Sequence, residues 1–145
     1  WLRANWSGKI IIKGVLDVED ARTAADMGFD GLVVSNHGGR QLDGVPSTIA
    51  VLPEIAAAVG ERMQILFDGG IRSGLDVVKA IALGADGCML GRAWAYALAA
   101  GGEAAVAHML EILRKEMLVA MALTGCTRLA DLRGSATIHA PQRRT

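Results

Sequence analysis

The side chains best suited to chemistry in this sequence stand in a short glycine-rich run. His37 is followed by two glycines and then by Arg40. An imidazole can accept a proton near neutral pH, and a guanidinium can hold a carboxylate through two parallel hydrogen bonds. A base and a carboxylate clamp in one loop suit a substrate with an acid group beside the reacting carbon. Taken alone, the pair is equally compatible with a structural role.

Two further segments combine glycine with arginine and could bind a phosphate group. The first is Asp68–Gly74 (DGGIRSG), and the second is Gly91-Arg92. Glycines let backbone N–H groups come close to an anion, and the N-terminus of a following helix adds a favourable dipole. Tight turns with surface arginines are the alternative. Phosphate binding alone does not name a cofactor.

Each of these groups follows an apolar run of strand length. The expected strands are Lys9–Val15, Gly31–Ser35, Gln64–Phe67 and Gly87–Leu90. They are apolar throughout, as is typical of parallel strands with both faces buried. Polar groups come at their ends, at Lys13, Asn36–Arg40, Asp68–Gly70 and Gly91-Arg92. In a barrel of parallel strands such groups meet on one rim, so we expect them to converge.

Segments of helical periodicity alternate with these strands. Asp17 is a plausible N-cap of a helix reaching about Met27, with Asp20 as an acidic capping-box partner and Gly28 as a left-handed stop. The other expected helices are Thr48–Val59, most firmly from Pro53 in a first turn, Gly74 to Leu83 capped by Gly84, and Gly102–Leu123. Four such units predict either a small doubly wound sheet or part of a (β/α)8 barrel, and periodicity does not choose between them.

Composition excludes several classes of protein. The 145 residues include 15 basic and 15 acidic side chains, so no electrostatic footprint for nucleic acid is present. We see no apolar run long enough to span a bilayer, no secretory signal and no metal-type spacing. Cys88 and Cys126 are expected to be reduced, intracellular thiols. His108 and His139 carry no functional signal. The start at Trp1, inside what resembles the end of a helix, suggests a fragment.

At these residues the sequence resembles the FMN-dependent α-hydroxy acid dehydrogenase/oxidase family, which includes L-lactate dehydrogenase, glycolate oxidase and mandelate dehydrogenase. The matching stretches are IIIKGVLDVEDA, GLVVSNHGGRQLDG, ILFDGGIRSGLDVVKAIALGAD and LGRAWAYALAAGGEAAV. SNHGGRQLD is the most specific of them. The family's fold is a (β/α)8 TIM-type barrel, so the resemblance implies that residues 1–145 are the C-terminal part of one barrel domain, with strands five to eight.

The resemblance also implies roles for individual residues. Lys13 would lie near the flavin N1/C2 carbonyl region and stabilise the reduced flavin, and Ser35 would contact the flavin. His37 would be the active-site base that also binds substrate, and Arg40 would bind the substrate carboxylate. Asp68 would hydrogen-bond the ribityl chain of FMN. The phosphate would be held by the loop residues Gly69, Gly70, Arg72, Gly91 and Arg92.

The implied reaction is oxidation of an (S)-2-hydroxy acid, with L-lactate favoured and glycolate or mandelate as alternatives. Electrons would pass to FMN and on to a quinone, a cytochrome or oxygen. The resemblance implies a homotetramer, located in the cytoplasm or peripherally on the inner membrane. The substrate-binding tyrosines and an aspartate that pairs with the histidine belong to the absent first half, so that half is an expected partner.

Three alternatives are weighed against this interpretation. An IMP dehydrogenase-like barrel shares the phosphate loop but uses a catalytic cysteine, and Cys88 lies within a strand. A type 2 isopentenyl diphosphate isomerase is disfavoured by the His-Gly-Gly-Arg segment. A non-catalytic half-barrel module remains compatible with a chain that lacks half of its site.

Overall fold

The computed structural model describes residues 1–134 and is built around a four-stranded parallel sheet. Its strands are β1 (Ile11–Val15), β2 (Gly31–Val34), β3 (Gln64–Phe67) and β4 (Gly87–Cys88). They lie side by side in chain order. A doubly wound sheet reverses its strand order at a switch point. The uninterrupted order β1-β2-β3-β4 therefore selects part of a barrel over the doubly wound alternative.

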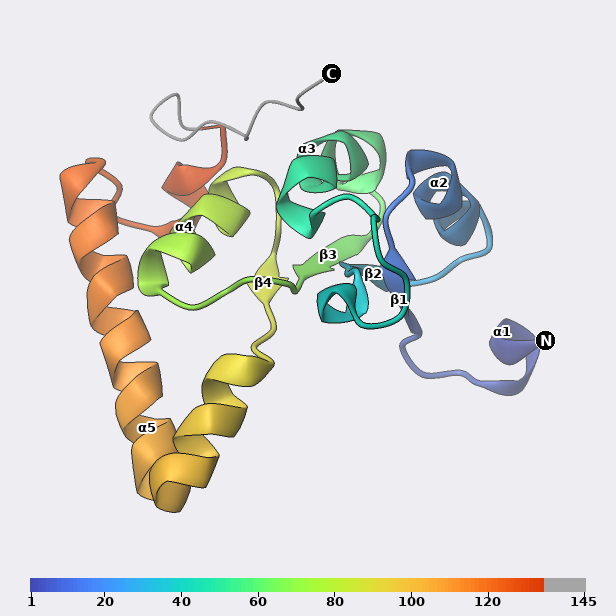
Figure 1. The fold of residues 1–145 in the computed structure, drawn as a ribbon. Coiled ribbons are helices and arrows are strands. Elements are labelled where there is room, and N and C mark those ends of the chain that lie inside the picture. Colours follow the sequence, from blue (N-terminus) through green and yellow to red (C-terminus); the bar gives the residue numbers. More distant parts are fainter. Residues whose placement is uncertain (135–145) are drawn as a thin grey trace.

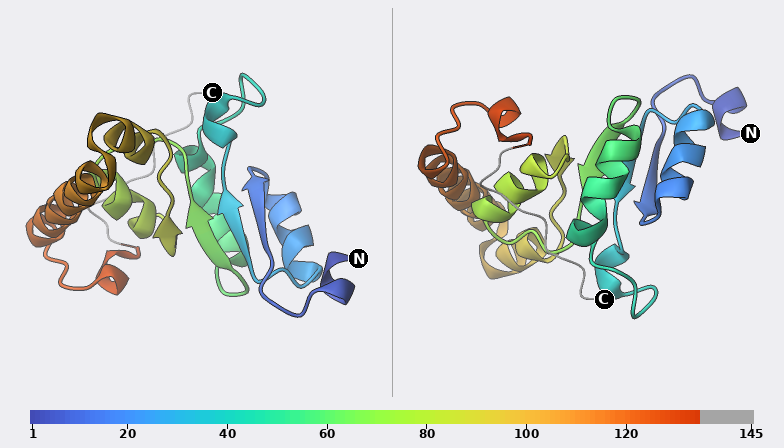
Figure 2. Two further views of the ribbon diagram at one scale, coloured as in Figure 1. Left: turned by 90° about the horizontal axis from the view of Figure 1, so that it is seen from below. Right: turned by 90° about the horizontal axis from the view of Figure 1, so that it is seen from above.

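Helices alternate with the strands. The α-helices are α1 (Leu2–Asn5), α2 (Val18–Asp26), α3 (Thr48–Val59), α4 (Gly74–Ala82) and α5 (Arg92–Leu123), and the 3-10 turns are η1 (His37–Gly39) and η2 (Leu129–Leu132). Figure 1 shows α2, α3 and α4 in an arc along one side of the sheet. Figure 2 shows α2 beside β1 at one end of the sheet and α5 beyond β4 at the other.

The main core lies between one face of the sheet and helices α2 and α3. Its fully buried members include Leu32, Val34, Ile65 and Phe67 from the strands, and Ala21, Leu52, Ile55 and Val59 from the helices. Side chains alternate between the two faces of a strand. The other face therefore carries Val33, its register partner Lys13 and, two residues on, Ser35. Helices α2 and α3 therefore cover one face of the sheet, and the polar side chains of Lys13 and Ser35 lie on the opposite face.

The predicted helix ends are largely confirmed. The side chain of Asp17 accepts hydrogen bonds from the amides of Glu19 and Asp20, at 2.8 and 3.3 Å. The expected reciprocal bond, from the Asp17 amide to the Asp20 carboxylate, is not present among the described residues, so that part of the prediction is wrong. Gly28 (φ 77°) and Gly84 (φ 112°) adopt the left-handed backbone expected of helix stops.

The segments Gly28–Gly31 and Gly84–Gly87 share the pattern Gly-x-Asp-Gly and are structurally equivalent. Asp30 accepts a hydrogen bond from the amide of Ile10 at 2.8 Å, and Asp86 accepts one from the amide of Ile65 at 2.7 Å. Each aspartate thus ties the start of one strand to the start of the next. The side-chain hydrogen bond from Lys9, followed by the Ile10 amide, lowers the pKa of Asp30 to about 2.

Helix α3 has the predicted bounds, Thr48–Val59, but Pro53 lies inside it and not in its first turn. Burial of the α3 apolar stripe, about 1.5–3 kcal/mol per large side chain, offsets the proline's cost of about 3 kcal/mol. Strand β4 has two residues instead of four. Helix α5 starts at Arg92, ten residues early, and bends at Gly101 and Gly102, whose backbone angles are not helical.

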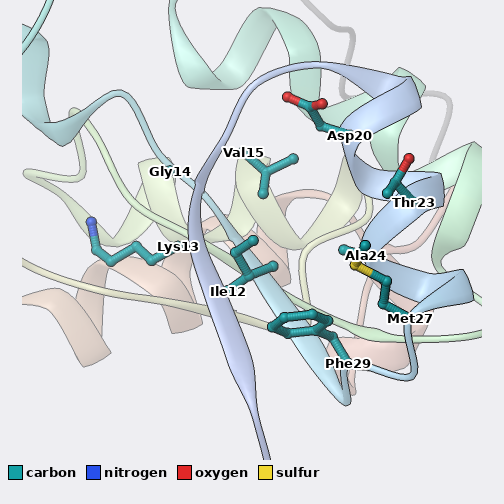
Figure 3. A pocket seen from close by; sticks show the side chains of 9 residues that line it. All are labelled: Ile12, Lys13, Gly14, Val15, Asp20, Thr23, Ala24, Met27 and Phe29. Atoms are coloured by element: carbon teal, nitrogen blue, oxygen red, sulfur yellow. The ribbon is translucent and has the colours of Figure 1, made fainter. Parts of the chain in front are cut away.

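A hollow of about 340 Å³ lies between β1 and α2 (Figure 3). Apolar groups such as Ile12, Met27 and Phe29 line most of it. Lys13 and Gly14 also line it, and the side chain of Lys13 points to the opposite side of the strand from Met27 and Phe29 (Figure 3). Within residues 1–134, no helix has the length and apolar character required to cross a membrane.

Candidate active site

Three polar side chains from three neighbouring strands meet on the uncovered face of the sheet. The ammonium group of Lys13 lies 2.8 Å from a carboxylate oxygen of Asp68 and donates a 2.8 Å hydrogen bond to the hydroxyl of Ser35. Ser35 is fully buried, whereas the side chains of Lys13 and Asp68 are 38% and 18% exposed. Lys13 lies within β1, and Ser35 and Asp68 directly follow β2 and β3. The predicted convergence of Lys13 with Asp68 is confirmed.

The His37 turn is attached to this cluster through Ser35. The Ser35 hydroxyl accepts a 3.1 Å hydrogen bond from the amide of His37. His37 has a positive φ of 55°, which is uncommon for a residue with a side chain. The side chain of Asn36 accepts from the amide of Gly38 at 3.0 Å, and Arg40 Nε donates to the carbonyl of His37 at 3.1 Å. These bonds hold the strained turn, and His37 and Arg40 both remain exposed.

Asn36, which is expected only as one of the polar residues after a strand, and Thr48, which has no predicted role, also shape the site. The hydroxyl of Thr48, which is buried, donates to the carbonyl of Gly69 at 3.4 Å. A Cβ on Gly69 would lie 2.7 Å from that hydroxyl and 3.4 Å from the side-chain oxygen of Asn36. Asn36 could have been found from its place before a turn, a position that favours asparagine. Thr48 gave no local signal, because its partner is 21 residues away.

At the N-terminus of α4, amides that the phosphate prediction relied on already donate to carboxylates. A carboxylate oxygen of Asp76 accepts from the amides of Arg72 and Ser73 at 3.0 and 2.9 Å. Glu116, from α5, accepts from the amide of Gly74 at 2.6 Å. Two carboxylates therefore already take the three amide donors of this helix start. The exposed guanidinium of Arg72 is still free to reach beyond this turn.

The N-terminus of α5 provides the open position instead. Gly91 is its N-cap, no side chain caps it, and its first turn holds no acidic residue. A Cβ on Gly91 or on Gly70 would meet no atom within 4 Å, so the backbone faces open space at both places. The strands before these glycines are neighbours, with Phe67 paired to Cys88. With the exposed Arg72 and Arg92, this region fits a phosphate-bearing cofactor.

Other candidate groups do not contribute to the site. Burial raises the pKa of the Cys88 thiol to about 12, which keeps it protonated and argues against a catalytic cysteine. His108 is exposed on α5, and His139 lies outside the described residues. In the described part of the chain, no group of three or more His, Cys, Asp or Glu side chains could hold a metal ion.

A sequence profile described as FMN-dependent dehydrogenase matches residues 1–139. The chain belongs to the FMN-dependent dehydrogenase family. FMN is the cofactor of this family, and its phosphate suits the open glycine and arginine segments at the ends of β3 and β4. In the cluster of Lys13, Ser35 and Asp68, the last two residues directly follow β2 and β3, at the end of the sheet where these segments begin.

Relatives of known name support this assignment. An L-lactate dehydrogenase from Caulobacter vibrioides is 62% identical over 132 residues, which are 91% of this chain and 34% of that protein. One from Pectobacterium atrosepticum is 60% identical over 144 residues, which are 99% of this chain and 37% of that protein. A crystal structure of mandelate oxidase superposes with a TM-score of 0.88 at 51% identity, and covers 91% of this chain and 38% of its own.

The FMN-dependent dehydrogenase chain therefore spans about a third of the length of the curated relatives that it matches. The fold prediction of a TIM-type barrel, represented by four of its strands, is confirmed by the parallel sheet and by the similarity to mandelate oxidase. The catalytic, substrate-binding and cofactor-binding roles of individual residues stay predictions.

Proposed function

We propose that the complete enzyme, meaning this chain together with the N-terminal part of the barrel, oxidises an (S)-2-hydroxy acid to the 2-oxo acid. L-Lactate is the favoured substrate, because the relatives named L-lactate dehydrogenase are 57–62% identical to this chain. The observation that carries the proposal is the connection of the His37 turn to the Lys13–Asp68 ion pair through the buried hydroxyl of Ser35. The backbone of the proposed base is thus hydrogen-bonded to the same hydroxyl that accepts from the lysine of the ion pair.

His37 and Arg40 act on the substrate in this proposal. The guanidinium of Arg40 binds the substrate carboxylate and fixes its orientation. The imidazole of His37 accepts the proton that the CHOH group of the substrate releases. Arg40 Nε also donates to the His37 carbonyl, which ties the carboxylate clamp to the backbone of the residue that carries the base. Positioning of this kind is a large part of what an active site contributes.

The remaining site residues hold the cofactor. Lys13, Ser35 and Asp68 would contact the flavin ring and the ribityl chain of FMN. The phosphate would be bound by the open backbone at Gly70 and Gly91, by the neighbouring Gly69 and by the guanidinium groups of Arg72 and Arg92. When bound, FMN supplies the two-electron acceptor for the oxidation. The protein's own contribution is to orient the substrate and to move the proton.

The N-terminal part of the barrel is required to complete the site. In the described structure β1 and β4 are both edge strands, and unpaired edges invite association. Large apolar side chains near these edges are also exposed: Ile11 is 47% and Trp94 is 44% exposed. We therefore propose that the preceding part of the barrel pairs with both edges. A homotetramer and a peripheral position on the inner membrane stay predictions.

The proposed function is tested by the anaerobic visible spectrum of the complete enzyme. We expect flavin bands that bleach on addition of L-lactate, and weaker or slower bleaching with glycolate or mandelate. Chain 1–145 expressed alone serves as the comparison, and we expect it to lack tight FMN binding and lactate oxidation.

The outcomes of this experiment separate the alternatives. Flavin bands that bleach with mandelate or glycolate alone would keep the reaction and change the substrate. Flavin bands that no hydroxy acid bleaches would remove the proposed reaction. A complete protein without flavin would favour a non-catalytic module.

Replacing Arg40 by lysine in the complete enzyme should weaken both substrate binding and turnover. A lysine ammonium group lacks the planar fork that holds a carboxylate through two hydrogen bonds, and it cannot at the same time reproduce the bond from Arg40 Nε to the His37 carbonyl. We expect kcat/KM for L-lactate to fall roughly 10–100-fold, the scale of a lost hydrogen bond to a charged group. Steady-state kinetics with a saturating electron acceptor measures it.

The Arg62→Lys variant is a matched control, because Arg62 pairs with Asp26 on the surface, outside the site. It should keep the wild-type kinetic constants. If Arg40→Lys behaved like Arg62→Lys, another group would have to hold the substrate carboxylate.

A further inference from the structure

Gly14 of β1 lies directly against the imidazole ring of His37. A Cβ built on Gly14 would lie 2.8 Å from His37 Cε1, 3.6 Å from Nε2 and 3.7 Å from Nδ1. All three ring atoms are thus close to one backbone position, which means that the ring covers the place where a side chain would be. Contacts shorter than 3.0 Å are essentially never made by a real Cβ. The imidazole can occupy this position only because residue 14 is glycine.

The backbone around Gly14 is specialised in the same way. The register between β1 and β2 shifts between Lys13 and Val15, so that Gly14 is the extra residue of a bulge. Its φ of 102° lies in the region that favours glycine. Bulges are common beside active sites, where they redirect neighbouring side chains. One irregularity of β1 therefore directs Lys13 toward Ser35 and Asp68 and, at the next residue, leaves room for His37.

The other contacts of His37 fix only its backbone. Ser35 accepts from the His37 amide, and Arg40 donates to the His37 carbonyl. These bonds determine where the side chain starts, and the side chain itself is on an exposed turn. The close approach to Gly14 concerns the ring itself.

We propose that Gly14 is a positioning residue that places the imidazole of His37 for proton transfer. This inference rests on the proposed function, because it assigns Gly14 an effect on the rate only through His37. Moving a reacting group by about 1 Å can cost up to about 100-fold in rate. We therefore expect Gly14→Ala in the complete enzyme to slow flavin reduction by L-lactate roughly 10–100-fold while FMN remains bound.

Gly28→Ala is the matched control. Gly28 also has a positive φ, 77°, but the nearest atom to its Cβ position is Arg3 Cδ at 3.9 Å. It lies in the loop before β2, away from the polar residues that follow the strands. This variant carries a comparable backbone strain without the clash, so it should keep the rate of the wild-type enzyme.

The test combines a kinetic double-mutant cycle with crystal structures of the variants. Stopped-flow reduction rates are measured for wild type, Gly14→Ala, His37→Ala and the double variant. Because Gly14 acts through His37, the Gly14→Ala penalty should disappear in the His37→Ala background. The crystal structure of Gly14→Ala should show the imidazole displaced, with the Ser35 bond to the His37 amide retained.

Each outcome decides one question. An equal penalty in both backgrounds, or an unmoved imidazole with an unchanged rate, would overturn the role of Gly14. A wild-type rate for His37→Ala would instead overturn the proposed function. The position of the imidazole in the Gly14→Ala crystal structure would still test the contact between Gly14 and His37. If Gly14→Ala loses FMN, recovery of FMN binding in the double variant supports the clash with His37. Loss of FMN from both variants, with Gly28→Ala intact, rejects it.

Discussion

Replacing His37 by alanine in the complete enzyme is expected to slow the anaerobic reduction of FMN by L-lactate at least ~100-fold, the usual scale for loss of a general base. The flavin should remain bound, because the proposed cofactor contacts come from other residues. The Lys13–Asp68 pair and the hydroxyl of Ser35 do not require an imidazole at position 37. Stopped-flow absorbance at the flavin bands measures the rate, and the same bands report FMN content.

Two further variants separate loss of the base from other effects. His37→Asn keeps a residue type that tolerates the positive φ of this turn, so it tests the base with less backbone strain. His108→Ala removes an exposed histidine on α5 and should behave like wild type. A rate for His37→Asn close to that of His108→Ala would exclude His37 from the proton transfer.

Much of the fold could be predicted because its signals are local. Asp17 and Gly28 lie at the two ends of one helix, and each acts through residues a few positions away. The β-branched runs became strands, and the polar residues after them met, because parallel strands place their carboxyl ends together. Helix α5 shows the opposite case. The Gly101-Gly102 pair reads locally as a break, yet the chain is helical on both sides of a bend.

The parts of the site that could not be predicted depend on contacts between distant residues. Gly14 and His37 are 23 positions apart, and the sequence shows only a glycine within a strand run, which signals a bulge or a close approach without naming the neighbour. The ion pair of Lys13 with Asp68 is likewise non-local. The segment before α4 is predicted to bind phosphate from its glycines and arginine, and the Glu116 carboxylate that accepts from the Gly74 amide lies 42 residues further along the chain.

The Gly74→Ala variant of the complete enzyme is expected to be strongly destabilised for this reason. A Cβ on Gly74 would lie 2.2 Å from the carbonyl oxygen of Leu113, 2.4 Å from the amide nitrogen of Met117 and 2.6 Å from Cβ of Glu116. Two of these atoms are backbone, so a rotamer change cannot relieve the clash. Helices α4 and α5 would have to separate, which would also break the bond from the Gly74 amide to Glu116.

We expect the free energy of unfolding to fall by about 3 kcal/mol or more, at or beyond the upper end of ordinary overpacking. FMN content should fall too, because α4 follows the loop that carries Gly70 and Arg72. Urea unfolding at fixed protein and FMN concentrations measures the change, since bound ligand shifts apparent stability. Gly87→Ala is the control, because its Cβ would meet only the flexible tip of Leu66, at 3.3 Å. A stability of Gly74→Ala within about 1 kcal/mol of Gly87→Ala would mean that α4 and α5 are not packed backbone to backbone at this point.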